Sequence, residues 1–120
     1  MLIQSEVESG EPMLYHLELP GCLTKSKESA AASYVLLLDS QIGTGAAAFM
    51  ALRVLKDHGV REDHIIFCTI LVSRVGGIWA LRDAFPGVRI VASEVDDGLE
   101  ERWCVVLSIF RVYRRRSFPR

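Results

Sequence analysis

The sequence predicts an α/β fold: a mostly parallel sheet with flanking helices and a small antiparallel hairpin at the N-terminus. From residue 34 onward, short runs that are almost wholly apolar alternate with helix-length stretches. Continuous apolar runs are typical of parallel strands that helices cover on both faces. Before residue 20, two short apolar runs instead flank a Gly-Glu-Pro turn signal, which favours a hairpin.

The hairpin is predicted from residues 2–4 and 13–19, with the reversal at 8–12. Residues 21–33 are small and polar, and we expect them to form a connecting segment between the hairpin and the sheet. The first twenty residues therefore stand apart from the alternating pattern that follows.

That alternating pattern predicts strands at 34–39, 64–71 and 88–93, with helices at 46–58 and 77–85. Gly59 is placed to cap the first helix, and Pro86 to end the second. Right-handed crossovers join parallel strands of this kind. Ligands bind beyond the carboxyl ends of the strands in such sheets, so the segment 39–45 lies at a candidate site.

Composition limits the chain to one domain or a piece of one. With 120 residues, half of them hydrophobic, the chain can bury one modest core and roughly two-thirds of its unfolded surface. The net charge is −1, but five arginines in the last ten residues leave the first 110 residues at −6. Five arginines with few interleaved aromatic residues are typical of a solvated tail, so no nucleic-acid partner is expected.

Cysteine and histidine usage gives no sign of a metal centre. The cysteines, Cys22, Cys68 and Cys104, are odd in number and lack ligand spacing, and the histidines are scattered. No apolar run reaches the 18 or more residues of a membrane span, and the first residues lack the basic start of a signal peptide. We expect a cytoplasmic protein with no metal site of its own and no membrane partner.

The segment 34–48 carries the chemistry. An apolar strand ends in Asp39, a short loop surrounds Thr44 and Gly45, and a helix begins. A helix N-terminus presents free amides and a positive dipole end to an anion. Small residues at 43–48 let these amides close around a phosphate, each charge-assisted bond contributing roughly 1.5–3 kcal/mol. Asp39 is placed to accept hydrogen bonds from ribose hydroxyls, as in a phosphoribosyl pyrophosphate loop.

Other interpretations of the same residues stay open. Residues 43–48 also match the loose dinucleotide pattern G-x-G-x-x-A, with Arg74 as a partner for a 2′-phosphate. The spacing argues against it, because residues 39–42 stand between the expected strand and the first glycine. A P-loop is excluded because the sequence has no G-x-x-x-x-G-K-[ST]. A tight strand–helix turn without a ligand is the plain alternative.

Several segments carry a resemblance to a known family, namely residues 2–20, 35–45, 54–67 and 76–99. They resemble uracil phosphoribosyltransferases, most of all the phosphoribosyltransferase part of uridine kinase-like fusion proteins. The loop Thr-Gly-Ala-Ala-Ala and the segment 85–91 are the sharpest parts. The resemblance implies a partial type I phosphoribosyltransferase-like domain at 1–101, followed by a divergent segment at 102–120 that is apolar and then arginine-rich.

The resemblance implies an enzyme of pyrimidine salvage that transfers ribose 5-phosphate from phosphoribosyl pyrophosphate to N1 of uracil, giving UMP and pyrophosphate. It also implies Mg²⁺ bound through the pyrophosphate, and a homo-oligomer. The residues implied to bind phosphoribosyl pyrophosphate are Asp39, Ser40, Gln41, Ile42, Gly43, Thr44, Gly45, Ala46 and Ala47. Ala48 adjoins them, and Asp96 aligns with an acid that precedes the nucleobase segment. No residue is assigned as catalytic.

The sequence also departs from the family pattern. The family loop usually continues Thr-Gly-Gly, and here Ala46 takes the last place, where a Cβ narrows the backbone choices. The family's upstream pyrophosphate arginines and its glycine-rich uracil segment are not recognised. The alternative function is therefore a catalytically incomplete, non-enzymatic remnant, or a regulatory or oligomerising module of a uridine kinase-like protein. Asp96 and Asp97 also fit a solvated turn.

Overall fold

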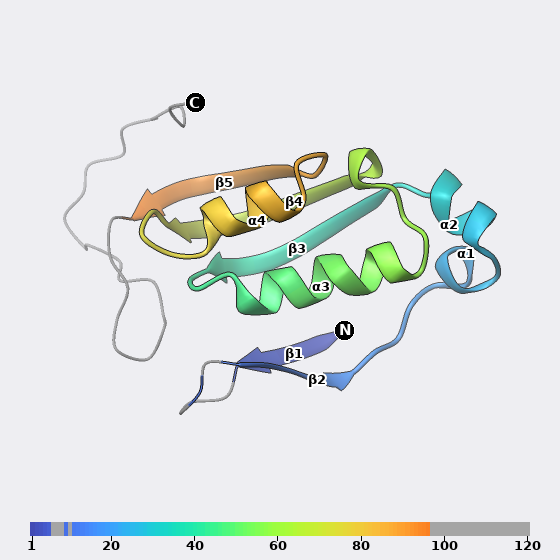
Figure 1. Ribbon diagram of the computed structural model, residues 1–120, viewed down its shortest axis with the longest axis horizontal. Helices are drawn as coiled ribbons and strands as arrows, with labels where there is room; N and C mark the ends of the chain where they lie inside the picture. Colours follow the sequence, from blue (N-terminus) through green and yellow to red (C-terminus); the bar gives the residue numbers. More distant parts are fainter. Residues whose placement is uncertain (6–8, 10, 97–120) are drawn as a thin grey trace.

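A computed structural model describes residues 1–5, 9 and 11–96. The expected segment 102–120, with its arginines, lies outside the described residues. In chain order, the elements are β1 (Leu2–Ser5), β2 (Pro12–His16), α1 (Gly21–Thr24), α2 (Lys27–Ala32), β3 (Val35–Ile42), α3 (Ala46–Asp57), the 3₁₀ turn η1 (Glu62–His64), β4 (Ile65–Ser73), α4 (Ile78–Ala84) and β5 (Arg89–Asp96) (Figure 1).

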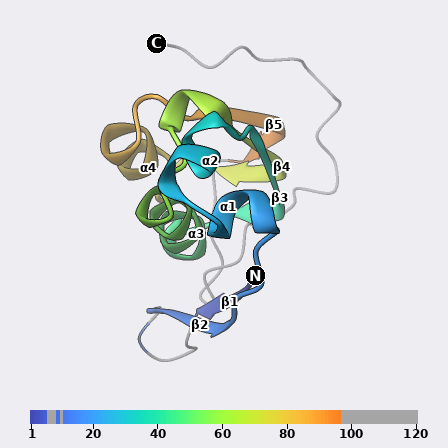
Figure 2. The same cartoon turned by 90° about the vertical axis from the view of Figure 1, so that its right-hand side faces the viewer.

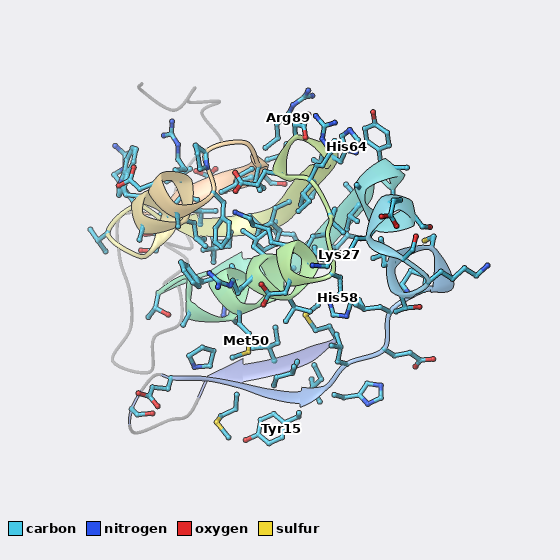
Figure 3. All side chains as sticks on the ribbon, turned by 45° about the vertical axis from the view of Figure 1, so that its right-hand side comes forward. Tyr15, Lys27, Met50, His58, His64 and Arg89 are labelled. Atoms are coloured by element: carbon cyan, nitrogen blue, oxygen red, sulfur yellow. The ribbon has the colours of Figure 1, made fainter. Side chains whose placement is uncertain are left out.

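Two sheets form from these strands. β1 and β2 pair antiparallel as the predicted hairpin, and β3, β4 and β5 pair parallel in that order. The hairpin contacts α3, and Met50 lies on the side of α3 that faces the hairpin (Figure 3). The predicted α/β fold is therefore confirmed, with the strands and helices in the expected order.

The parallel sheet is covered on one face in the described part of the chain, and the prediction of cover on both faces is wrong there. The strand order follows the chain in one direction, so two right-handed crossovers place α3 and α4 on the same side (Figure 2). Cover on both faces would need a reversal of the strand order. Val35 and Leu37 pack against the core, whereas Leu36 and Leu38 are 60% and 69% exposed.

The open face is apolar across all three strands. Leu38 pairs in register with Cys68, and Cys68 with Val91, so their side chains form one row. Val91 is 53% exposed, and Ile70, further along β4, is 65% exposed. A contiguous apolar surface of this kind usually marks a contact with something else.

The core lies between the sheet and the two helices. It consists mainly of Ala48, Leu52 and Leu55 from α3, Ile78 and Leu81 from α4, and Ile65 and Phe67 from β4. Gly59, in the left-handed conformation at φ 101°, ends α3 as predicted, with its amide donating to the Lys56 carbonyl at 2.9 Å. No helix within the described ranges is both long and apolar enough to cross a membrane.

Residues 21–33 are not a simple connecting segment, because they form α1 and α2. Ser26 caps α2, its hydroxyl accepting from the Ser29 amide at 3.1 Å, and a Lys-Glu-Ser-Ala-Ala-Ala sequence of good helix formers follows. Leu23 and Ala30 bury their side chains in the core. The mostly polar composition of this segment did not indicate that two apolar side chains would fix its conformation by packing into the core.

At the amino end of the sheet, Glu62 ties three elements together. Lys56 on α3 donates to one carboxylate oxygen, and the amide of Gly87, in the turn before β5, donates to the other at 2.9 Å. The hydrogen bond from Lys56 is the main reason that the pKa of Glu62 is lowered, and the Gly87 amide adds to it. The charged carboxylate is therefore the form that the fold stabilises.

Glu62→Gln is expected to lower the free energy of unfolding by about 1 kcal/mol at neutral pH. Because the folded-state pKa lies below the ordinary one, the contribution of Glu62 is present above its unfolded pKa. It is lost as the pH falls through the folded value, so the difference from wild type should shrink between about pH 6 and pH 3. Urea unfolding across this range measures it. The exposed Asp83→Asn is the control, and a difference independent of pH would contradict the assignment.

The one-sided core predicts different costs for two leucines. Changing Leu52, which is fully buried on α3, to alanine should lower the free energy of unfolding by about 2–5 kcal/mol, because a cavity is left behind. Leu38→Ala, on the open face, should lower the free energy of unfolding by less than about 1 kcal/mol. Urea unfolding of both variants measures this, and an equal loss would show that the face is covered in solution.

Candidate functional site

The candidate site lies at the carboxyl ends of the parallel strands, and its loop is shorter than expected. β3 runs to Ile42 instead of ending at Asp39, since its pairing with β4 continues through Ile42 and Val72. Only residues 43–45, here called the 43–45 loop, join β3 to α3. The spacing argument against a dinucleotide pattern is therefore wrong, because the strand does lead directly into Gly43.

The 43–45 loop depends on a glycine at its last position. Gly45 has φ 84° and is the N-cap of α3, whose first hydrogen bond runs from the Phe49 amide to the Gly45 carbonyl at 2.8 Å. A residue with a Cβ rarely adopts this left-handed conformation. The twelve-residue α3 thus begins immediately after the strand, with no acidic residue in its first turn to repel an anion.

The side chain of Thr44 folds back onto the start of the helix. Its hydroxyl oxygen accepts from the Ala46 amide at 3.3 Å. The hydroxyl keeps its own proton, so it can donate outward at the same time. The amides of Ala47 and Ala48 belong to the first turn of α3, where an α-helix supplies no intrahelical acceptor.

A second loop supports the first. Residues 76 and 77, here called the glycine turn, lie in the connection between β4 and α4, and the Gly77 amide donates to the Gly43 carbonyl at 3.0 Å. The Thr44 carbonyl also lies directly against Gly77. These glycines are not among the residues that the sequence predicts for the site. Two consecutive glycines just after a strand were the available signal, because they permit close backbone approach.

This contact fixes the direction of the loop amides. Every peptide bond in the described residues is trans, so each carbonyl points opposite to the N–H that follows it. The carbonyls of Gly43 and Thr44 face the glycine turn. The amides of Thr44 and Gly45 therefore point away from it.

Asp39 belongs to β3, four residues before the 43–45 loop. It nevertheless lies beside the start of α3. Its side chain is exposed, and one carboxylate oxygen accepts from the Ser40 amide at 2.7 Å. With Ala47 and Ala48, it lines a cavity of about 260 Å³ between β3, α3 and β1. Leu37 and Phe67 form apolar walls there. The structure thus brings together a carboxylate and the first turn of α3.

Several of the expected site residues can contribute only their backbone. Ile42 is 1% exposed and Ala48 4%, and both side chains belong to the core. Ser40 and Gln41 lie in β3 rather than in a loop, with Ser40 exposed and Gln41 half-buried. The described residues contain no group of three or more histidine, cysteine or acidic side chains that could hold a metal ion.

Asp96 is the last residue of β5 and is buried at 8% exposure, so the solvated-turn alternative is wrong for it. It pairs in register with Ser73, and its carbonyl accepts from the Arg74 amide at 2.7 Å. Asp96 lies at the same end of the sheet as the 43–45 loop. It is two strand spacings from β3, or about 10 Å, so it belongs to a different part of that end.

Comparison with known proteins agrees with this arrangement. The sequence model of the family described as uracil phosphoribosyltransferase matches residues 1–109. Uridine-cytidine kinase-like 1 of Mus musculus is 37% identical over 109 residues, which are 91% of this chain and 18% of that protein. Uracil phosphoribosyltransferase 1 of Schizosaccharomyces pombe is 34% identical over 106 residues, 88% of this chain and 45% of that one.

A solved structure shares the fold. The AQ2163 protein from Aquifex aeolicus matches with a TM-score of 0.67 at 19% sequence identity, over 86% of this chain and 44% of that one. The chain spans less than half the length of the relatives just described, from 18% to 45%. Because the family's sequence model covers most of this chain, the chain belongs to the uracil phosphoribosyltransferase family.

Proposed function

We propose that the chain supplies the phosphoribosyl pyrophosphate-binding part of a uracil phosphoribosyltransferase of pyrimidine salvage. One observation carries the proposal: the 43–45 loop turns the amides of Thr44 and Gly45 away from the glycine turn, at the N-terminus of a twelve-residue helix. A dianionic phosphate is stabilised by such amides and by the positive end of the helix dipole. Family membership supports a ribose phosphate as the ligand.

In this proposal the two parts of the site hold the two parts of ribose 5-phosphate. The loop amides and the Thr44 hydroxyl donate to the 5′-phosphate. The carboxylate of Asp39, beside the first turn of α3, accepts from the ribose hydroxyls. Ser40, Gln41 and Ile42 connect these two parts as extended backbone, which sets the distance between carboxylate and loop.

The reaction proposed for the complete enzyme breaks the bond between ribose C1′ and the pyrophosphate oxygen and forms a bond between C1′ and N1 of uracil, while pyrophosphate leaves and the N1 proton passes to solvent. The sugar passes through a positively charged, oxocarbenium-like state. Holding the ribose phosphate still and facing the uracil supplies the main advantage, because positioning removes an entropic part of the barrier. Fixed dipoles that suit the charge distribution supply the rest.

We also propose that Mg²⁺ enters with the substrate. The described residues form no acidic cage for a cation, and Asp39 is a lone carboxylate beside the loop. Pyrophosphate oxygens are hard ligands that suit Mg²⁺. The ion would neutralise the leaving group, while residues of this chain hold the sugar. A cytoplasmic location and a homo-oligomeric state remain predictions.

A second candidate function is a non-enzymatic module that binds a partner chain. The open sheet face favours it, because Leu36, Leu38, Ile70 and Val91 are exposed together. The measurement that separates the two candidates is UMP formation from uracil, phosphoribosyl pyrophosphate and Mg²⁺ by the purified chain. Product formation would exclude the module as the sole function.

Ligand binding tests the site itself. Ribose 5-phosphate should slow hydrogen exchange at the amides of residues 44–48. Thr44→Val should weaken its binding by about tenfold, because one donor to a charged group is lost. Calorimetric titration measures the affinity, with the exposed Thr24→Val on α1 as the matched control.

Asp39→Asn separates the two halves of the site. It should weaken binding of ribose 5-phosphate and leave binding of inorganic phosphate unchanged, because only the sugar contacts the carboxylate. Asp83→Asn, an exposed change on α4, should alter neither. If ribose 5-phosphate and phosphoribosyl pyrophosphate leave the exchange of residues 44–48 unaltered, the proposed function is wrong.

A further inference from the structure

We propose that Gly76 and Gly77 are positioning residues of the phosphate site: they hold the 43–45 loop in the orientation that points its amides at the ligand. The proposal rests on the proposed function for its ligand, ribose 5-phosphate. It assigns a role to two glycines between β4 and α4 that are not among the residues expected to bind phosphoribosyl pyrophosphate.

The two loops touch so closely that neither glycine has room for a side chain. A Cβ added at Gly76 would lie 1.9 Å from the Gly43 carbonyl oxygen, and one added at Gly77 would lie 1.6 Å from the Thr44 carbonyl oxygen. Contacts below 3.0 Å require one of the partners to move. At both positions the obstacle is backbone, which cannot swing aside as the end of a side chain can.

Lack of room for a Cβ, and not backbone conformation, is the reason that glycine is needed at positions 76 and 77. Gly77 has φ −75°, a value that any residue adopts, and Gly76 does not have a positive φ. By contrast, Gly45 needs its left-handed φ of 84°. An alanine at 76 or 77 therefore tests the contact between the loops without imposing an unfavourable backbone conformation.

The glycine turn is anchored on both sides. α4 begins at Ile78, which is 2% exposed, and Leu81 one turn later is 1% exposed, so the helix is fixed in the core. Before the turn, the Arg74 amide donates to the Asp96 carbonyl, and the Trp79 indole donates to the Arg74 carbonyl at 3.1 Å. An added Cβ at either glycine would therefore press on the carbonyls of the 43–45 loop from a turn that is fixed on both sides.

Movement of the loop changes what the ligand meets. The Gly43 carbonyl and the Thr44 amide share one rigid peptide plane, and the Thr44 carbonyl shares another with the Gly45 amide. Pushing either carbonyl away from the turn rotates the opposite N–H. Both amides that the proposed function aims at the phosphate are therefore set by the glycine turn.

The test compares Gly76→Ala and Gly77→Ala with Gly21→Ala. Gly21 is a matched control, because an added Cβ there meets only the end of the Lys25 side chain at 3.7 Å. We expect both turn variants to bind ribose 5-phosphate at least about tenfold more weakly, as for the loss of one donor to a charged group. In the absence of ligand, the NMR spectra of both variants should show amide resonances of residues 44–46 that are shifted from those of wild type. The control should match wild type in affinity and in these resonances.

Affinities within twofold of wild type in both folded turn variants would overturn the proposal. Wild-type protein supplies a second measurement if the variants fail to fold. Ribose 5-phosphate should slow exchange of the Gly77 amide, which is bonded to the Gly43 carbonyl, together with residues 44–46. Slowing at residues 44–48 without slowing at the Gly77 amide would also overturn the proposal. If wild type does not bind ribose 5-phosphate at all, the proposed function fails, whereas unshifted loop resonances in a folded ligand-free Gly77→Ala variant refute the positioning role.

Discussion

The contact between the backbones of two loops determines the candidate site. The Gly77 amide donates to the Gly43 carbonyl, and Gly77 lies against the Thr44 carbonyl, so the connections that follow β3 and β4 are joined at the same end of the sheet. Three features follow from this contact. The 43–45 loop has one orientation, its amides point away from the glycine turn, and α3 begins at a fixed place beside the strand. Hydrogen-bond donors held in advance lose little freedom when an anion arrives.

The direction of the strand order shapes the rest of the molecule. With β3, β4 and β5 in sequence order, right-handed crossovers place both helices on one face, and the core forms there. The opposite face carries exposed apolar side chains, such as Leu36 and Leu38. Such side chains are typical of strands that are covered on both faces. The chain therefore carries a candidate ligand site at one end of the sheet and an apolar surface on its open face. The first fits a phosphoribosyltransferase, and the second fits association with further protein.

Stability and the proposed chemistry use opposite ends of the sheet. At the amino end, Glu62 receives hydrogen bonds from Lys56 and Gly87 and joins α3, η1 and the turn before β5. At the carboxyl end, the loop positions are small, and several contribute only backbone groups. This division places charged side chains where they bind one another. It leaves the first turn of α3 free of acidic side chains that would repel an anion.

The sequence by itself determined the class of fold, the order of strands and helices, the hairpin and the strand–loop–helix segment at 34–48, because apolar periodicity, glycine and proline act locally. Family membership was also legible there, since the loop and the segment 85–91 are contiguous motifs. Only the tertiary structure decided that β3 extends to Ile42, because pairing with β4 continues past the polar residues. It also decided the burial of Asp96, the single covered face and the support of the loop by Gly76 and Gly77. Each of these depends on contacts between segments more than twenty residues apart, a distance over which local propensity carries no information.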